Sequence, residues 1–308
     1  MTVFTTILLK LIPLYLMILL GYFAARRLKV QKESIAKLLI YIVVPVVIFS
    51  GVYTAKISVA NLSLPILFFV ICSLTALIFL AIGTFVFKKD STKNLLAFTS
   101  GSGNTGYFGF PVILILFGNQ AFSIAVLCSL GYVLYESSLG FFLMAKGNYT
   151  AKESLTRIVK LPSVYAFFVG LLFNYLNINL GEVATTTIES FKGAYTLFGM
   201  MIIGMGLVTV TIRHIDFKFL SISFLAKFLF WPVVILGIVF LDKTFSQFYS
   251  QDIYNVLILM SIVPLAANTV TFATELKVHP DKAAVAVFGS TLFALFYIPL
   301  MVSLFGLS

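Results

Sequence analysis

Two short stretches of the chain hold residue types that bind small charged molecules. Residues 100–111 read SGSGNTGYFGFP, and residues 263–269 read VPLAANT. Each stretch combines an Asn-Thr pair with small residues and a proline, which interrupt regular helical hydrogen bonding. Main-chain amides freed in this way, together with Asn side chains, can hold a carboxylate without a buried cation. The candidate binding residues are Ser102, Gly103, Asn104, Thr105, Gly106, Pro111, Pro264, Ala267, Asn268 and Thr269.

The composition is that of a membrane protein. Of the 308 residues, 60% are hydrophobic and only 10% are charged, and the mean hydropathy is +1.08. A soluble domain of this size has too much surface to cover with so few charges. The net charge of +10 does not indicate nucleic acid, because the basic residues stand in short blocks between apolar runs. Cys72 and Cys128 fall within apolar segments and are expected to be core thiols, without a disulfide or a metal site.

The apolar runs predict an all-α fold with ten membrane-spanning helices. A spanning helix needs about 20 apolar residues, and the charged stretches between the runs mark the loops. The expected helices cover about 3–25, 33–54, 62–87, 93–117, 121–145, 155–176, 184–209, 217–241, 253–275 and 283–307.

The basic residues predict the orientation of the chain. Sixteen of the 21 lysines and arginines lie in the connections that follow the odd-numbered helices. Short cytoplasmic loops are rich in Lys and Arg, so these connections are expected inside the cell and both termini outside. The connections on the other side are expected to hold only Lys56, Lys192 and Lys243, and Trp231 is expected to anchor a helix at the membrane surface.

Corresponding residues recur half a chain apart. Pro13 precedes Gly21 by eight positions in the first expected helix, and Pro162 precedes Gly170 by eight in the sixth. The Asn-Thr pairs fall in the fourth and ninth. A second copy of five helices must enter the membrane from the opposite side. Residues 1–147 and 148–308 are therefore expected to form an inverted repeat, the common architecture of secondary transporters.

The two Asn-Thr stretches are expected near the middle of the membrane, as breaks in the fourth and ninth helices. A break in lipid leaves unpaired amides that cost several kcal/mol each, so it persists only inside protein or beside a polar cavity. Paired interruptions at corresponding positions point to a transporter's binding site. The alternative is that the small residues and prolines serve helix packing alone.

Glu136 and Lys227 are the charged residues expected deepest in the membrane. A carboxylate in this position is costly and is a functional candidate by default. Glu136 is expected either to couple transport to a proton or to Na⁺, or to lock its helix by pairing with Lys227.

These segments resemble the auxin efflux carrier family, in particular its prokaryotic branch. GNTGYFGFP is similar to the motif of the family's fourth helix, and VPLAANTVTFATEL followed by VFGSTLFALFYIPL is similar to its ninth and tenth helices, with Thr291 and Pro299. PLYLMILLGYFAAR and YIVVPVVIF, with Pro45, also fit, so the resemblance spans the chain.

The resemblance implies the ten-helix fold shared with bile acid/sodium symporters, in which helices four and nine cross beside the substrate. It further implies a scaffold unit of helices 1, 2, 6 and 7, a transport unit of helices 3–5 and 8–10, and a homodimer. Members carry organic anions, which are auxin in plants and malate- or malonate-type acids in bacteria. The seventh helix lacks the proline of many relatives, and the short connection after the fifth lacks the long insert of many plant members, which favours a prokaryotic anion carrier.

Other functions fit the sequence less well. An enzyme would need a nucleophile with a base, or a set of metal ligands, and the chain offers neither pattern, so no cofactor is expected beyond a coupling ion. An anion channel stays open as an alternative, because broken helices also build selectivity filters. A membrane-embedded ligand sensor is the third reading.

Overall fold

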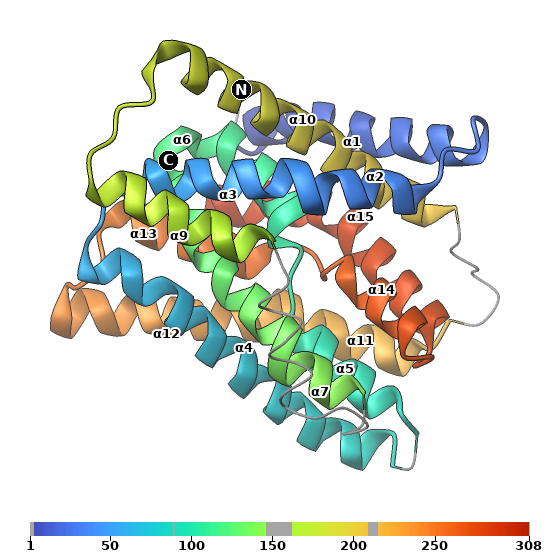
Figure 1. The fold of residues 1–308 in the computed structure, drawn as a ribbon. Coiled ribbons are helices and arrows are strands. Elements are labelled where there is room, and N and C mark those ends of the chain that lie inside the picture. The colour runs from blue at the N-terminus through green and yellow to red at the C-terminus, as the bar shows by residue number, and fades with distance from the viewer. Residues whose placement is uncertain (1–2, 89, 146–161, 209–214, 308) are drawn as a thin grey trace.

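The computed structural model describes residues 3–88, 90–145, 162–208 and 215–307, and every regular element in these ranges is a helix (Figure 1). The predicted all-α architecture therefore holds for the described residues. Six helical stretches are long and apolar enough to cross a membrane, and two shorter apolar helices, Pro162–Tyr175 and Gln251–Ile262, accompany them. The six are Val3–Arg26, Lys32–Tyr53, Val59–Val86, Thr92–Met144, Phe217–Ser246 and Pro280–Leu304.

The first half of the chain is a series of helices joined by short turns. Gly118 (φ 75°, ψ −166°) interrupts α6 between the expected fourth and fifth segments, in a conformation that favours glycine. Three π-helical turns continue or connect the helices, at Leu39–Val43, Thr105–Gly109 and Glu136–Gly140. The helices are α1 (Val3–Arg26), α2 (Lys32–Leu38), α3 (Val44–Tyr53), α4 (Val59–Val86), α5 (Thr92–Gly101), α6 (Phe110–Tyr135) and α7 (Phe141–Met144).

The second half is also a series of helices joined by short turns. Its π-helical turns are Ala226–Phe230 and Asp242–Ser246. The expected start of the sixth segment, the end of the seventh at 209 and the boundary between the two halves lie outside the described residues. The helices are α9 (Pro162–Tyr175), α10 (Gly181–Leu207), α11 (Phe217–Leu225), α12 (Trp231–Leu241), α13 (Gln251–Ile262), α14 (Asn268–Glu275) and α15 (Pro280–Leu304).

The helix pairs that contain the recurring glycines approach each other main chain to main chain. α1 packs along α10, and α3 packs along α9. A Cβ on Gly21 of α1 would overlap the backbone of Met201 in α10, and a Cβ on Gly170 of α9 would lie 2.9 Å from the carbonyl oxygen of Phe49 in α3. The two glycines that recur in the sequence therefore have the same task, which is to let a neighbouring backbone approach.

The remaining helices form a second packed group. α4 packs along α5 and α6, α13 contacts α6 and α15, and α14 lies against α15. Phe68, Tyr132 and Trp231 stack in its interior, with the rings of Tyr132 and Trp231 5.4 Å apart. In lipid such rings stabilise the helix packing through close contact and ring–ring interaction, the latter contributing about 0.5–1.5 kcal/mol for each pair.

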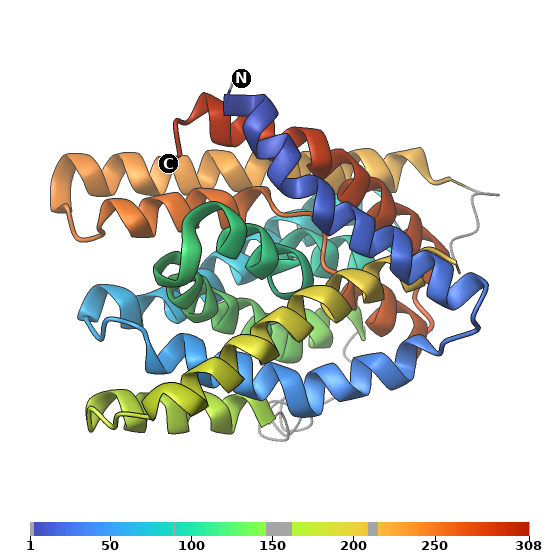
Figure 2. The same cartoon turned by 90° about the horizontal axis from the view of Figure 1, so that it is seen from above.

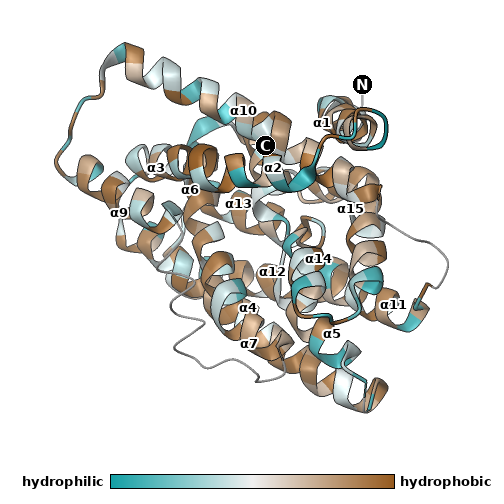
Figure 3. Cartoon of the chain, turned by 45° about the vertical axis from the view of Figure 1, so that its right-hand side comes forward, coloured by the Kyte–Doolittle hydropathy of each residue, from teal (hydrophilic) through white to brown (hydrophobic). Residues whose placement is uncertain are grey.

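A polar cluster ties three connections together at one end of this second group. Lys282, in the first turn of α15, lies 2.8 Å from Asp216 and 3.6 Å from Asp90, and His279 lies 2.7 Å from Asp90. Figure 3 shows hydrophilic residues near α5, α11 and α14 at this end. Figures 1 and 2 place the two chain ends near each other, away from this cluster.

Two sequence predictions are wrong. Lys192, expected in a connection, lies inside α10 and is only 5% exposed, because its ammonium reaches Glu189 and Asn119 at 2.8 and 3.2 Å. Trp231, expected at the membrane surface, is fully buried.

Candidate functional site

The first Asn-Thr stretch is a true interruption of the helix. α5 ends at Gly101, Ser102 is extended (φ −102°, ψ 163°), and Asn104 has φ −76° and ψ 61°. The chain then forms the π-helical turn Thr105–Gly109, and α6 resumes with Pro111 in its first turn. Ser102, Asn104 and Thr105 are all at most 5% exposed, so the interruption lies inside protein.

The second stretch interrupts its helix differently. α13 ends at Ile262, Val263 is extended (φ −63°, ψ 152°), and α14 begins at Asn268. Pro264 has no N–H to continue the helix, so the main chain leaves helical geometry here. Leu265 instead donates its N–H to the hydroxyl of Ser290 in α15 at 3.1 Å.

The fold brings the two interruptions into contact. The N–H of Asn104 donates to the carbonyl oxygen of Pro264 at 2.9 Å. The carbonyl oxygen of Asn104 accepts from the N–H of Gly109 at 2.9 Å, which closes the π-helical turn. One main-chain hydrogen bond therefore links residues 160 positions apart, at the centre of both predicted sites.

Several buried polar atoms at this contact have no hydrogen-bond partner among the described residues. They are the side-chain nitrogen of Asn104, the hydroxyl of Thr269 and the ammonium of Lys227. Leaving one such group unpaired costs about 1–3 kcal/mol, and more for a charged group. Such groups are rare in folded proteins and each calls for an explanation, of which a bound ligand, ion or water is one.

Lys227 is fully buried next to the first interruption. A Cβ on Gly103 would lie 2.8 Å from its Nζ, so glycine at 103 leaves room for the ammonium. The same Nζ lies 4.7 Å from the ring centre of Trp231 and 5.7 Å from that of Tyr132. Cation–π contacts contribute about 2 kcal/mol when desolvated, which is less than the several kcal/mol that burial of an ion costs. A negative charge nearby would therefore be stabilised strongly.

Glu136 does not form a hydrogen bond with Lys227. Its carboxylate accepts from the side-chain amide of Asn268 at 2.9 Å. No salt bridge joins the two buried charges among the described residues. Lys227 lies against Gly103 of the first interruption, whereas Glu136 lies beside both Ser102 of the first interruption and Asn268 of the second. Both Glu136 and Lys227 lie in π-helical turns, which occur frequently at functional sites.

The other predicted residues surround this contact. Ser102 donates its hydroxyl to the carbonyl oxygen of Phe98 at 2.7 Å, and Gly106 lies against the hydroxyl of Tyr195. Ala267 lines a crevice of about 30 Å³ with Lys32 of α2 and Val270 of α14, so the second interruption reaches a small open space.

Two residues hydrogen-bond the main chain next to the interruptions, a role that the sequence does not predict. The indole N–H of Trp231 donates to the carbonyl oxygen of Ser100 at 2.7 Å, immediately before the first interruption. Ser290 serves the second interruption through Leu265. Both lie far from the interruptions in sequence, and no local pattern marks them.

Comparisons with known proteins identify the family of the chain. The sequence model of the membrane transport protein family matches residues 6–302. An uncharacterized transporter of Methanocaldococcus jannaschii is 26% identical over 305 residues, covering 92% of this chain and 94% of its own length. An uncharacterized transporter of Methanothermobacter thermautotrophicus is 25% identical over 272 residues, covering 87% of each chain.

These matches extend over nearly the whole chain, and its apolar helices suit a protein that passes through the cell membrane several times. The chain belongs to the membrane transport protein family, which includes the auxin efflux carriers.

Proposed function

We propose that this protein is a secondary transporter that carries a small organic anion across the cytoplasmic membrane by alternating access. The anion binds where the fourth and ninth of ten spanning helices cross. The observation that carries this proposal is the hydrogen bond between Asn104 and Pro264, which joins two interrupted helices beside unpaired polar groups.

The groups at this contact suit a carboxylate. The side-chain nitrogen of Asn104 and the hydroxyl of Thr269 can both donate to it. Lys227 adds a positive charge in a surrounding of low dielectric constant, where an ion pair is stronger than in water.

The architecture behind the proposal is an inverted repeat of residues 1–147 and 148–308. Its support is the matched pair of contacts in which Gly21 meets α10 and Gly170 meets α3. α1, α2, α3, α9 and α10 form the scaffold unit, and the remaining helices form the transport unit that moves against it. Exchange of the shapes of the two halves then opens the site to each side in turn.

Glu136 is the candidate for coupling to H⁺ or Na⁺. Its carboxylate contacts Asn268 of the second interruption, so a cation or proton at Glu136 would change the hydrogen bonding of that segment directly. Uptake by Glu136→Gln across a range of pH and Na⁺ tests this role. Coupling requires the dependence on pH or Na⁺ to disappear in the variant.

The test of the whole proposal is uptake into proteoliposomes of radiolabelled malonate, malate and indole-3-acetate. Asn104→Ala removes a donor to a charged ligand and is expected to lower uptake by about tenfold or more, since such a bond contributes roughly 1.5–3 kcal/mol. Wild-type uptake by both Asn104→Ala and Asn268→Ala would refute the site.

The same vesicles separate a carrier from the two alternatives. A carrier shows saturable uptake that substrate on the opposite side accelerates. Ohmic current without saturation would indicate an anion channel instead. Binding without any flux would indicate a ligand sensor.

A further inference from the structure

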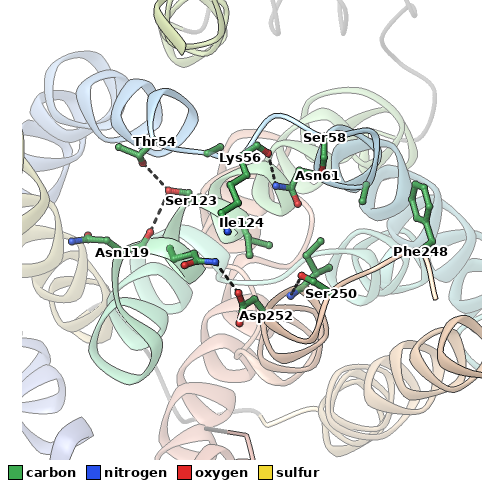
Figure 4. Close-up of a pocket in the computed structure, with 14 residues that line it drawn as sticks. Thr54, Lys56, Ser58, Asn61, Asn119, Ser123, Ile124, Phe248, Ser250 and Asp252 are labelled. Carbon is green, nitrogen blue, oxygen red and sulfur yellow. Dashed lines mark hydrogen bonds between the residues drawn. The ribbon is translucent and has the colours of Figure 1, made fainter. Parts of the chain in front are cut away.

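A second and larger cavity lies away from the crossing helices. Its volume is about 630 Å³, and none of the residues that line it belongs to the two interruptions. It lies between the connection after α3, the turn at Gly118 and the connection before α13 (Figure 4). Pockets that hold small organic molecules have volumes of about 300–1,000 Å³, so the cavity is large enough for one.

Lys56 gives this cavity a positive charge. Figure 4 shows its side chain extending from the connection into the space between the labelled residues. The carbonyl oxygen of Lys56 accepts from the side-chain amide of Asn61, which fixes the connection from which the side chain starts. No ion pair to Lys56 occurs within the described ranges, so its ammonium is available to a ligand.

The surrounding helices add to the positive potential. α4 begins after Ser58, α13 begins after Ser250, and the helix that follows Gly118 begins at Asn119. The first turns of all three line the cavity, and the N-terminus of a helix carries a partial positive charge. Three helix ends and one ammonium therefore share a single cavity.

Asp252 is the opposing charge in the lining. Its carboxylate accepts from the side-chain amide of Gln120 at 2.8 Å and does not pair with Lys56. A ligand with one carboxylate can place it at Lys56 and keep it away from Asp252. A second carboxylate on the same small ligand would meet Asp252 and be repelled.

We propose that this cavity is a separate binding site for a small monocarboxylate, with Lys56 as its counter-ion and Asp252 as the group that rejects dicarboxylates. It receives the solute on the face opposite the lysine-rich connections, before or after its passage through the crossing site. The class of solute rests on the proposed function, whereas the site itself rests on the cavity and its charges.

The rate of thiol labelling in detergent reports the electrostatic potential in the cavity, and its measurement does not require transport. Thr54 lines the cavity, so Thr54→Cys supplies a thiol there, while Cys72 and Cys128 are fully buried. The labelling rate is measured with a negatively charged and with a positively charged methanethiosulfonate of similar size. Lys56→Gln in this background is expected to lower the negative-to-positive rate ratio by about tenfold, and Asp252→Asn to raise it.

Lys243→Gln is the matched control, because Lys243 lies in the π-helical turn Asp242–Ser246, outside the lining of the cavity, with its ammonium over the ring of Tyr254. Its rate ratio is expected to stay within about twofold of the parent, as surface charges are screened over about 10 Å. An unchanged ratio in Lys56→Gln, or an equal fall in Lys243→Gln, would overturn the site.

Protection by ligands tests the chemical class. Propionate is expected to slow labelling saturably in the Thr54→Cys parent but not in Lys56→Gln, and malonate, of equal chain length, is expected to protect less. Equal or stronger protection by malonate would overturn the assignment to monocarboxylates. These results do not depend on uptake, so a loss of transport in Asn104→Ala bears on the crossing site alone.

Discussion

The interruption in the first half is enclosed, whereas the interruption in the second half borders open space. Asn104 is 4% exposed and its side-chain nitrogen is unpaired, while Asn268 is exposed and its amide is held by Glu136. The two asparagines correspond in sequence but differ in surroundings. In the proposed function the first asparagine receives the anion, and the second, through its hydrogen bond, connects the crossing site to the buried carboxylate of Glu136.

The largest expected effect comes from a charge placed at the second asparagine. Asn268→Asp replaces the donor to Glu136 with a second carboxylate, and a like charge in contact with the buried carboxylate of Glu136 repels it. We expect loss of uptake and a lower melting temperature in detergent. An Asn268→Asp variant that keeps wild-type stability and uptake would contradict the contact with Glu136.

Truncation of the two asparagines sharpens the comparison. Asn268→Ala leaves the carboxylate of Glu136 without its donor and is expected to lower stability by about 1–3 kcal/mol, together with uptake. Asn104→Ala removes an amide nitrogen that has no protein partner, so stability should hardly change while uptake falls. Thermal unfolding of both variants measures the difference. Equal loss of stability would show that the two surroundings are alike.

The glycines of the first interruption offer a test of its enclosure. A Cβ on Gly101 would lie 2.5 Å from the ring of Tyr135 and 2.7 Å from the carbonyl oxygen of Cys72, whereas on Gly109 its nearest neighbour is 3.3 Å away. Gly101→Ala is expected to destabilise by about 1–3 kcal/mol and Gly109→Ala by less. The melting temperatures of the two variants measure the difference. A larger loss of stability in Gly109→Ala than in Gly101→Ala would contradict the packing described.

One side-chain hydrogen bond holds the main chain at each interruption, from Trp231 at the first and to Ser290 at the second, and the two bonds can be compared directly. Trp231→Phe removes the donor to Ser100, and Ser290→Ala removes the acceptor of the Leu265 N–H. Both leave a buried main-chain group unpaired, so each is expected to cost about 1–3 kcal/mol in unfolding free energy. The double variant measures the coupling between the two hydrogen bonds. If the losses of unfolding free energy in the single variants add up to the loss in the double variant, the two bonds act independently.

The smallest effect is expected at the polar cluster. Partial burial raises the pKa of Asp90, but hydrogen bonds from Thr92 and the contact with His279 outweigh it and hold the pKa well below its usual value. The pKa of Asp216 is also lowered, because hydrogen bonds from Lys282 and the N–H of Phe219 outweigh partial burial.

A lowered carboxylate pKa contributes stability above the unfolded value of about 4, and this contribution is lost as the pH falls below it. Lys282→Ala is therefore expected to lower stability at pH 7 by less than about 1 kcal/mol, since partly exposed ion pairs contribute little. The deficit should shrink as the pH falls below about 4. A deficit independent of pH would assign Lys282 a packing role instead.

The sequence predicts the interruptions well because their causes are local. Glycine and proline act on their own backbone, so Gly103 and Pro264 mark the breaks without knowledge of the rest of the fold. The partners of the buried charges depend on tertiary packing. Glu136 hydrogen-bonds Asn268 of a distant segment, and Trp231, which is apolar enough for the membrane surface or the core, lies in the core. The sequence also cannot show that Lys192 lies inside a helix, because the partner of its ammonium, Asn119, comes from a distant segment of the chain.

The close approach of α1 to α10 has a mechanical consequence. Glycines on both helices, Gly21 and Gly204, bring backbone against backbone, and no layer of side chains is available there to rearrange. α1 and α10 can therefore tilt only together, as one rigid body. Any displacement during a transport cycle must then fall at junctions filled by pliable side chains, such as those between α3 and α6 or between α1 and α15.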